Sequence, residues 1–118
     1  MRAYIASRFR NKGSVKSLSS ALRGLGWFPI QTWPEEHDNC DPRLAAERDL
    51  QEIDSCDACV VLTVDCKLVP GGMHFEAGYA YSKGKKIIVV GPQVNIFYKL
   101  STVVHFETVQ EFLNWVQK

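Results

Sequence analysis

The sequence lacks any apolar run close to the roughly 20 residues that span a bilayer, and no signal-peptide core opens it. It also lacks an excess of either charge, because 14 Lys and Arg face 13 Asp and Glu for a net charge of +1. Interspersed charges provide no electrostatic footprint for duplex nucleic acid or an anionic membrane. We therefore expect a cytoplasmic protein with neither a membrane nor a nucleic acid as partner.

Internal repeats and low-complexity segments are also lacking. The chain has 118 residues, of which 46% are hydrophobic. That length supports one substantial core and is too short for two. We expect residues 1–118 to form a single domain.

Cysteine is present at only four positions, Cys40, Cys56, Cys59 and Cys66. The CxxC from Cys56 to Cys59 precedes an expected strand, whereas a thioredoxin-type motif follows a strand and opens a helix. A zinc site would need two further ligands, such as His37 and Cys40. We expect buried reduced thiols, no metal and no organic cofactor.

Hydrophobic periodicity predicts alternating strands and helices. We expect strands at 3–6, 27–33, 58–64, 86–91 and 102–106, the second at a sheet edge because of Pro29. Helices are expected at 14–25, 42–55, 72–83 and 107–118, with Ser14 and Asp41 as N-caps and Gly26 and Gly84 as stops. Residues 96–100 fit either a helix or a strand.

This alternation predicts an α/β protein, a flavodoxin-like or Rossmann-like three-layer sandwich around a five-stranded parallel sheet of order 2-1-3-4-5. Ligands of such sheets bind outside the carboxyl ends of the strands, where the strand order reverses. That crevice would collect Tyr4, Ser7, the loop 8–13, Asp65, the Gly71-Gly72 turn and Glu76.

Glu76 is the first candidate for chemistry. Gly71 and Gly72 predict a tight turn that opens a helix, and Glu76 is expected in its first turn, where the helix dipole keeps a carboxylate ionised. On a helical wheel Glu76 lies beside a small apolar face. An acid on the surface of a protein usually lies away from such an apolar face, so the position of Glu76 is unusual.

Asp49 is the second candidate. On a helical wheel it falls within the apolar stripe of Pro42, Ala46, Leu50 and Ile53, and an unpaired buried carboxylate costs several kcal/mol. Two interpretations stay open on this evidence. Asp49 pairs with an arginine such as Arg8 or Arg48, or it serves a functional site.

Four segments in the same order resemble the nucleoside 2-deoxyribosyltransferase family, including the related 2'-deoxynucleoside 5'-phosphate N-hydrolases. These segments are YIAS at 4–7, DL at 49–50 before CDA at 56–58, GMHFEAGYA at 72–80 and GKKI at 84–87. The resemblance covers most of the chain. It implies Glu76 as the nucleophile, Asp49 as the group that assists at the nucleobase and Tyr4 as the residue that orients the nucleophile.

The resemblance implies cleavage of the N-glycosidic bond of 2'-deoxynucleosides through a covalent deoxyribosyl-Glu76 intermediate, with transfer of the sugar to another nucleobase. It also implies a substrate without a 2'-hydroxyl. The alternatives are a deoxynucleoside 5'-monophosphate N-hydrolase and a non-catalytic nucleotide-binding or sensing module. The non-catalytic module is favoured by Pro70, which stands where the family carries aspartate or serine.

The expected substrate-binding residues are Ser7, Arg8, Phe9, Asp65, Gly71, Gly72 and Asn95. Arg8, Arg10 and Lys12 fit either a phosphate site or a solvated basic loop. The candidates for base stacking are Trp33, His37 and Tyr98, which fit packing equally well. The resemblance further implies a homodimer or higher homo-oligomer whose subunits complete one another's pockets, with Asn95 and Tyr98 as candidate contributors.

Overall fold

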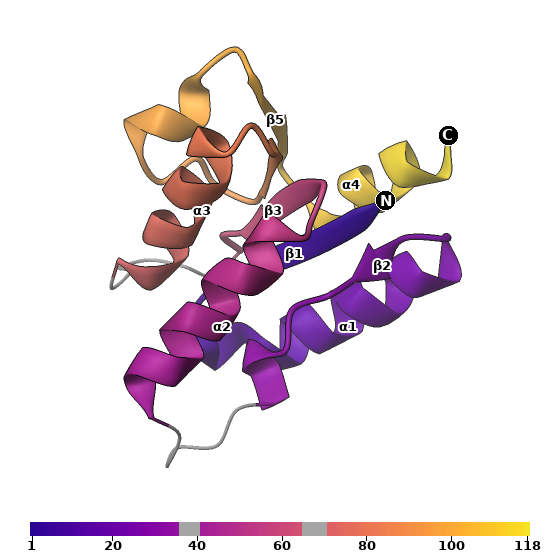
Figure 1. Ribbon diagram of the computed structural model, residues 1–118. Coiled ribbons are helices and arrows are strands. Elements are labelled where there is room, and N and C mark those ends of the chain that lie inside the picture. Colours follow the sequence, from indigo (N-terminus) through magenta and orange to yellow (C-terminus); the bar gives the residue numbers. More distant parts are fainter. Residues whose placement is uncertain (36–40, 65–70) are drawn as a thin grey trace.

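The computed structural model describes residues 1–35, 41–64 and 71–118 and contains a parallel five-stranded sheet (Figure 1). The strands are β1 (Arg2–Ala6), β2 (Phe28–Pro29), β3 (Ala58–Leu62), β4 (Lys86–Val90) and β5 (Val103–Phe106). Their order is β2-β1-β3-β4-β5. The predicted flavodoxin-like topology is confirmed, and the order reverses between β1 and β3.

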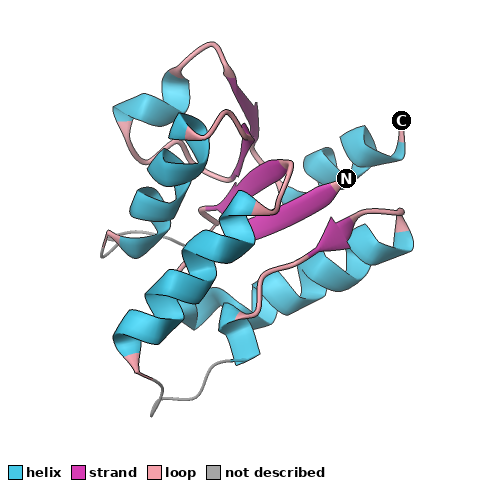
Figure 2. Cartoon of the chain, in the orientation of Figure 1, coloured by secondary structure: helices cyan, strands magenta, loops and turns pink. Residues whose placement is uncertain are grey.

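Helices cover both faces of the sheet (Figure 2). The helices α2 (Pro42–Asp54) and α3 (Gly72–Ser82) contact each other on one face, and α1 (Lys12–Gly24) and α4 (Val109–Gln117) contact each other on the other. Three short 3-10 helices are η1 (Phe9–Asn11), η2 (Trp33–Glu35) and η3 (Ile96–Lys99). The segment at 96–100 that the sequence left open is therefore mainly a helical turn.

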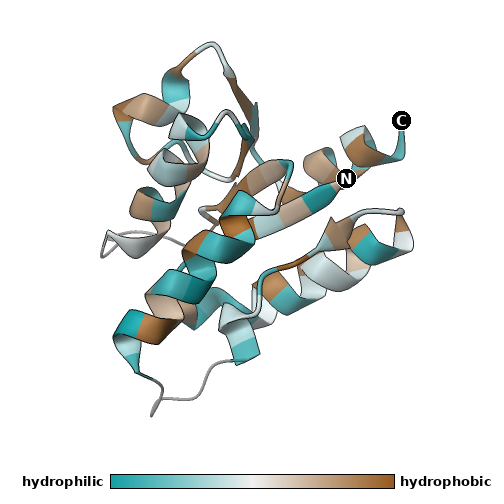
Figure 3. Cartoon of the chain, viewed as in Figure 1, coloured by the Kyte–Doolittle hydropathy of each residue, from teal (hydrophilic) through white to brown (hydrophobic). Residues whose placement is uncertain are grey.

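The core lies in the central strands, which are buried on both sides as expected for a parallel sheet. Every residue of β3 is buried, and so is every residue of β4 after Lys86. In contrast, α2 is largely hydrophilic on the side seen in Figure 3. Within the described ranges, none of the helices combines the length and the apolarity that crossing a bilayer requires.

The start of α1 differs from the prediction. The helix begins at Lys12, with Asn11 rather than Ser14 at its N-cap. The 3-10 turn η1 leads directly into α1, so the helical backbone is already established before Ser14. The Asn11 side chain makes no cap bond and instead donates to Ser7 Oγ and to the Val64 carbonyl, both at 3.1 Å.

The predicted strand at 27–33 is also shorter than expected, since β2 pairs with β1 only at Phe28 and Pro29. Beyond Pro29, side chains form the hydrogen bonds that the backbone of a longer β2 would form with β1. The Ile5 N–H donates to Gln31 Oε1 at 3.1 Å, and Trp33 Nε1 donates to the Ile5 carbonyl at 2.8 Å. The backbone polar groups of β1 are satisfied, although a regular strand has ended.

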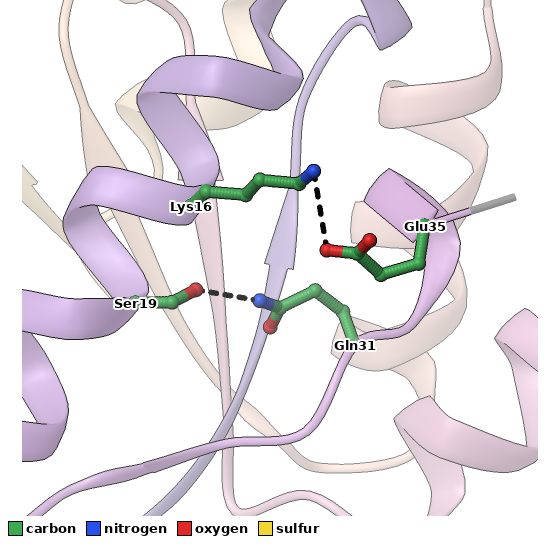
Figure 4. Close-up of polar contacts among 4 residues, drawn as sticks. All are labelled: Lys16, Ser19, Gln31 and Glu35. Atoms are coloured by element: carbon green, nitrogen blue, oxygen red, sulfur yellow. Dashed lines mark hydrogen bonds and ion pairs between the residues drawn. The ribbon is translucent and has the colours of Figure 1, made fainter.

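The segment after β2 is also attached to α1 (Figure 4). Gln31 Nε2 donates to Ser19 Oγ at 2.8 Å, and Lys16 Nζ lies 3.2 Å from Glu35 Oε1. The exposed ion pair contributes about 0–1 kcal/mol. These contacts hold Trp33 at the carboxyl end of β1.

Glycine at the helix ends behaves as predicted at two positions, because Gly26 and Gly84 follow α1 and α3 with φ values of 90° and 76°. As predicted, α3 begins at Gly72 after a turn at Gly71, but the turn does not need glycine. Gly71 has a right-handed φ of −64°, and a Cβ at either position would meet nothing within 4 Å. Neither residue is required by the backbone.

Gly91 has the strictest requirement for glycine. Its φ is 116°, and an added Cβ would lie 2.6 Å from Thr63 Oγ1 and 2.7 Å from the Val64 nitrogen. Thr63 is buried and donates to the Pro92 carbonyl at 2.7 Å. This close approach joins the carboxyl ends of β3 and β4.

We predict that Gly91→Ala destabilises the protein by about 2–4 kcal/mol, because it combines backbone strain with overlap against buried atoms. The matched control is Gly13→Ala in α1, where a Cβ meets nothing within 4 Å and φ is not positive. The control should gain about 0.4–1 kcal/mol. Urea unfolding of the two variants measures the difference, and equal stabilities would contradict this account of Gly91.

Candidate active site

A pocket of about 310 Å³ lies between α2 and α3, beside the carboxyl end of β1. This position agrees with the crevice predicted for the reversal of strand order. Its lining residues are Ser7, Phe9, Trp33, Ala46, Asp49, Leu50, Gly72, Met73, Phe75 and Glu76. Both predicted catalytic carboxylates are therefore on its wall.

Tyr4 lies beneath this pocket and is fully buried on β1. Its hydroxyl donates to Glu76 Oε2 at 2.5 Å. A hydrogen bond to a carboxylate is among the stronger ones in proteins. Because Tyr4 is held by the rigid central sheet, the bond orients the half-buried Glu76 side chain.

The pKa of Tyr4 is raised well above its ordinary value, first by burial and then by the negative charges of Glu76 and Asp49. Tyr4 therefore stays protonated and keeps its role as a donor. The same effect shows that Asp49 and Glu76 act electrostatically on one buried hydroxyl. The structure brings together all three residues for which the resemblance implied catalytic roles.

The helix α2 is less buried than its periodicity predicted. Of the expected stripe, Ile53 is buried and Leu50 is half-buried, whereas Pro42 and Ala46 are exposed. The amino-terminal part of α2 faces the pocket rather than the core, and Ala46 is on the pocket wall. Asp49 is half-buried at this transition, with its Oδ1 atom shielded from solvent.

The location of Glu76 within α3 also needs correction. The helix begins at Gly72, so Glu76 is its fifth residue and not in the first turn. The helix dipole acts mainly within the first turn. The Tyr4 hydroxyl, rather than the end of the helix, is the donor that the structure places on Glu76. The small apolar face beside it is as predicted, with Met73, Ala77 and Ala80 buried.

Ser7 lies on the pocket wall, where its hydroxyl donates to the Leu62 carbonyl at 2.7 Å. This bond joins the ends of β1 and β3, and the Ser7 oxygen also accepts from Asn11 Nδ2 at 3.1 Å. Phe9 and Trp33 form an aromatic corner of the pocket, with ring centroids 6.3 Å apart and planes inclined by 47°. Trp33 is held in place by its bond to the Ile5 carbonyl.

A second hollow of about 440 Å³ adjoins this pocket. It is lined by Ser7, Arg8, Phe9, Arg10, Gly72 and Met73. Four of these residues also line the pocket with Glu76. The hollow therefore places two arginines next to the candidate site.

Gly71 and Asn95 are not on the wall of the Glu76 pocket. Both line a larger pocket of about 730 Å³ formed by α3, η3 and β5. Asn95 Oδ1 accepts the Phe97 N–H at 2.9 Å and caps η3, so part of its polarity is used locally. Asp65 and Pro70 lie outside the described residues.

Phe75 is the main pocket residue that the sequence analysis missed. It precedes Glu76 on α3, and two-thirds of its side-chain surface is exposed. A large apolar residue on the outer side of a helix, next to a candidate nucleophile, was an available signal.

Candidate metal ligands are not clustered in the part of the chain that the structure describes, where no three His, Cys, Asp or Glu side chains come together. Cys56 and Cys59 are buried free thiols. Burial raises the pKa of both, so each stays protonated at neutral pH. The burial expected for these two thiols is confirmed.

We predict that Tyr4→Phe destabilises the protein by about 1–3 kcal/mol near neutral pH, because Glu76 loses its buried donor. The pKa of Tyr4 is higher in the folded than in the unfolded state, so its contribution is complete below about pH 10 and decreases above it. The difference between wild type and variant should therefore fall by about 1.4 kcal/mol per pH unit above that point. Urea unfolding at a series of alkaline pH values measures this difference, and a constant difference would contradict it.

Comparison with known proteins shows the fold. No protein-family model matches the chain, and no curated protein matches it. Among solved structures, a CMP N-glycosidase of Clostridium botulinum, BcmB, is similar over 98% of both chains, with a TM-score of 0.70 and 21% sequence identity. The chain therefore has the fold of this N-glycosidase, as the resemblance to the nucleoside 2-deoxyribosyltransferase family implied.

Proposed function

We propose that this protein is an enzyme that cleaves the N-glycosidic bond of a nucleoside or nucleotide. The observation that carries the proposal is the Tyr4 hydroxyl bonded to Glu76, with Asp49 on the wall of the same pocket. Two carboxylates around one pocket suit a reaction with an oxocarbenium-like transition state. The fold shared with an N-glycosidase supports this class of reaction.

In the first step a Glu76 carboxylate oxygen bonds to the anomeric carbon as the bond to the base nitrogen breaks. The electron pair of that bond leaves with the base, which takes a proton from Asp49. In the second step another base or water attacks the anomeric carbon, displaces the Glu76 carboxylate and returns a proton to Asp49. Atoms and charges balance without a metal or an organic cofactor.

Tyr4 acts in the first step by orienting the Glu76 carboxylate. Its hydroxyl donates to one Glu76 oxygen, Oε2, and so fixes the orientation of the carboxylate. Because Tyr4 stays protonated, it does not compete as a nucleophile. Fixing the carboxylate before the substrate arrives reduces the entropy cost of reaching a reactive geometry.

The aromatic corner of Phe9 and Trp33 suits a flat nucleobase. The adjoining hollow with Arg8 and Arg10 suits a 5'-phosphate, since guanidinium groups bind phosphate oxygens through paired hydrogen bonds. This hollow favours a 5'-monophosphate N-hydrolase as the second candidate function, beside sugar transfer between bases. The similar N-glycosidase is named for a nucleoside monophosphate, CMP.

The experiment incubates the protein with four substrates, a deoxynucleoside, its 5'-monophosphate and the ribose counterpart of each, with and without a second free base. Chromatography separates the products. Exchange of bases indicates a transferase, and release of free base without exchange indicates a hydrolase. No turnover of any substrate would leave the non-catalytic nucleotide-binding module as the remaining interpretation.

We expect the deoxy compound of each pair to react faster, because a 2'-hydroxyl next to the anomeric carbon would crowd the approaching Glu76 carboxylate. The measurement is kcat/KM for matched ribose and deoxyribose substrates. Equal values, or a preference for ribose as in the substrate of the CMP N-glycosidase, would contradict the deoxy preference. The glycosidic chemistry itself would remain.

We predict that Glu76→Gln lowers kcat by about 10³-fold or more, about 4 kcal/mol of barrier. Asp49→Asn should cost less, about 10²-fold, the lower end for a general acid, because solvent supplies part of the proton transfer. The matched control is Glu47→Gln, an exposed acid on α2 outside the lining of the pocket. It should leave kcat unchanged.

A slowly turned over substrate should also leave a sugar on the peptide that contains Glu76, which mass spectrometry detects. The folded state of each variant is checked by thermal melting. A Glu76→Gln protein with normal melting and normal turnover would rule out the covalent mechanism.

A further inference from the structure

Phe75 is the most exposed aromatic residue on the wall of the Glu76 pocket. Its exposed fraction is 67%, compared with 46% for Phe9 and 6% for Trp33, the two other aromatic residues of that wall. A single exposed apolar side chain is common on a protein surface, but this one lines the candidate site. Because burying apolar surface is favourable, a ligand that covers the Phe75 ring gains binding energy.

The contacts of Phe75 also differ from those of the other two rings. Phe9 and Trp33 contact each other, with centroids 6.3 Å apart. Among the described residues, the Phe75 ring has no aromatic partner. Its exposed π surface is therefore available to a flat aromatic ligand.

The aromatic residues of the pocket come from different elements. Phe9 on η1 and Trp33 on η2 belong to the loops after β1 and β2, whereas Phe75 belongs to α3. The pocket has a volume of only about 310 Å³, and pockets for small molecules cover most of the surface of their ligand. A base that lies against Phe9 and Trp33 is therefore within reach of the Phe75 ring.

The position of Phe75 on α3 points to the base rather than to a phosphate. Phe75 directly precedes Glu76, and consecutive helical side chains point about 100° apart, so the two line adjoining parts of the wall. The base is attached to the anomeric carbon that Glu76 attacks, so it lies in this same pocket. In contrast, Phe75 does not line the adjoining hollow, which contains Arg8 and Arg10.

We propose that Phe75 stacks on the nucleobase of the substrate and completes, with Phe9 and Trp33, a slot for a flat aromatic base. This inference rests on the proposed function. The base stays flat while its bond to the sugar breaks, so stacking stabilises the bound substrate and the transition state about equally. Phe75 is thus a specificity residue that lowers KM and leaves kcat nearly unchanged.

The test replaces Phe75 by Ala, Leu and Trp, and measures kcat and KM for the most rapidly cleaved of the four substrates described above. Phe75→Ala should raise KM about 5- to 150-fold, the factor that stacking of one base on an aromatic ring provides, with little change in kcat. Phe75→Leu keeps an apolar side chain without a ring and should bind as weakly as Phe75→Ala. Phe75→Trp should restore the low KM.

The matched control is Phe97→Ala, because Phe97 is also 67% exposed but lies on η3, outside the lining of the Glu76 pocket. It should leave KM unchanged. Calorimetry in the Glu76→Gln background, which prevents turnover, then compares the Kd of the substrate with that of deoxyribose 5-phosphate, a ligand without a base. Phe75→Ala should weaken only the first, and circular dichroism checks that each variant is folded.

Unchanged KM and Kd in a folded Phe75→Ala protein would overturn the proposal. So would a Phe75→Leu protein that binds like wild type, or an equal loss of affinity for deoxyribose 5-phosphate. Turnover that Phe75→Ala does not affect would contradict this inference alone. Absence of turnover, with a nucleotide Kd that Phe75→Ala weakens, would contradict the proposed function alone, and a wild type that binds no nucleoside or nucleotide would contradict both.

Discussion

The hydrogen bond from Tyr4 to Glu76 is the interaction on which the candidate site depends. It joins a fully buried tyrosine on β1 to a half-buried carboxylate on α3. Burial and two neighbouring acids keep the hydroxyl protonated, so the bond keeps one direction, from tyrosine to glutamate. The sheet is closely packed because both of its faces are covered. Tyr4 is fixed in this sheet, so its hydrogen bond holds the Glu76 carboxylate in place.

The pocket above this bond exists because regular structure ends early on both sides of it. Pairing between β1 and β2 stops after Pro29. The side chains of Gln31 and Trp33 then bond the backbone N–H and carbonyl of Ile5. On the other side, the amino-terminal part of α2 extends past the core. Because of both departures, side chains that would otherwise pack in the core line the pocket instead.

The two sides of α3 differ in character. One side presents Glu76 to the polar pocket, and the other presents an uncharged apolar surface. Between them, Phe75 contributes to both.

The sequence by itself predicted the alternation of strands and helices and the order of the strands, and its resemblance to a known family pointed to Tyr4, Asp49 and Glu76 together. Periodicity and glycine stops are local signals, and a parallel sheet follows from their alternation. Only the tertiary structure decided that Tyr4 bonds Glu76, 72 residues away, that Trp33 closes the pocket and that Asn95 lies on the far side of α3. These contacts join segments that are distant in the chain, and no local pattern encodes which side chains meet across a core.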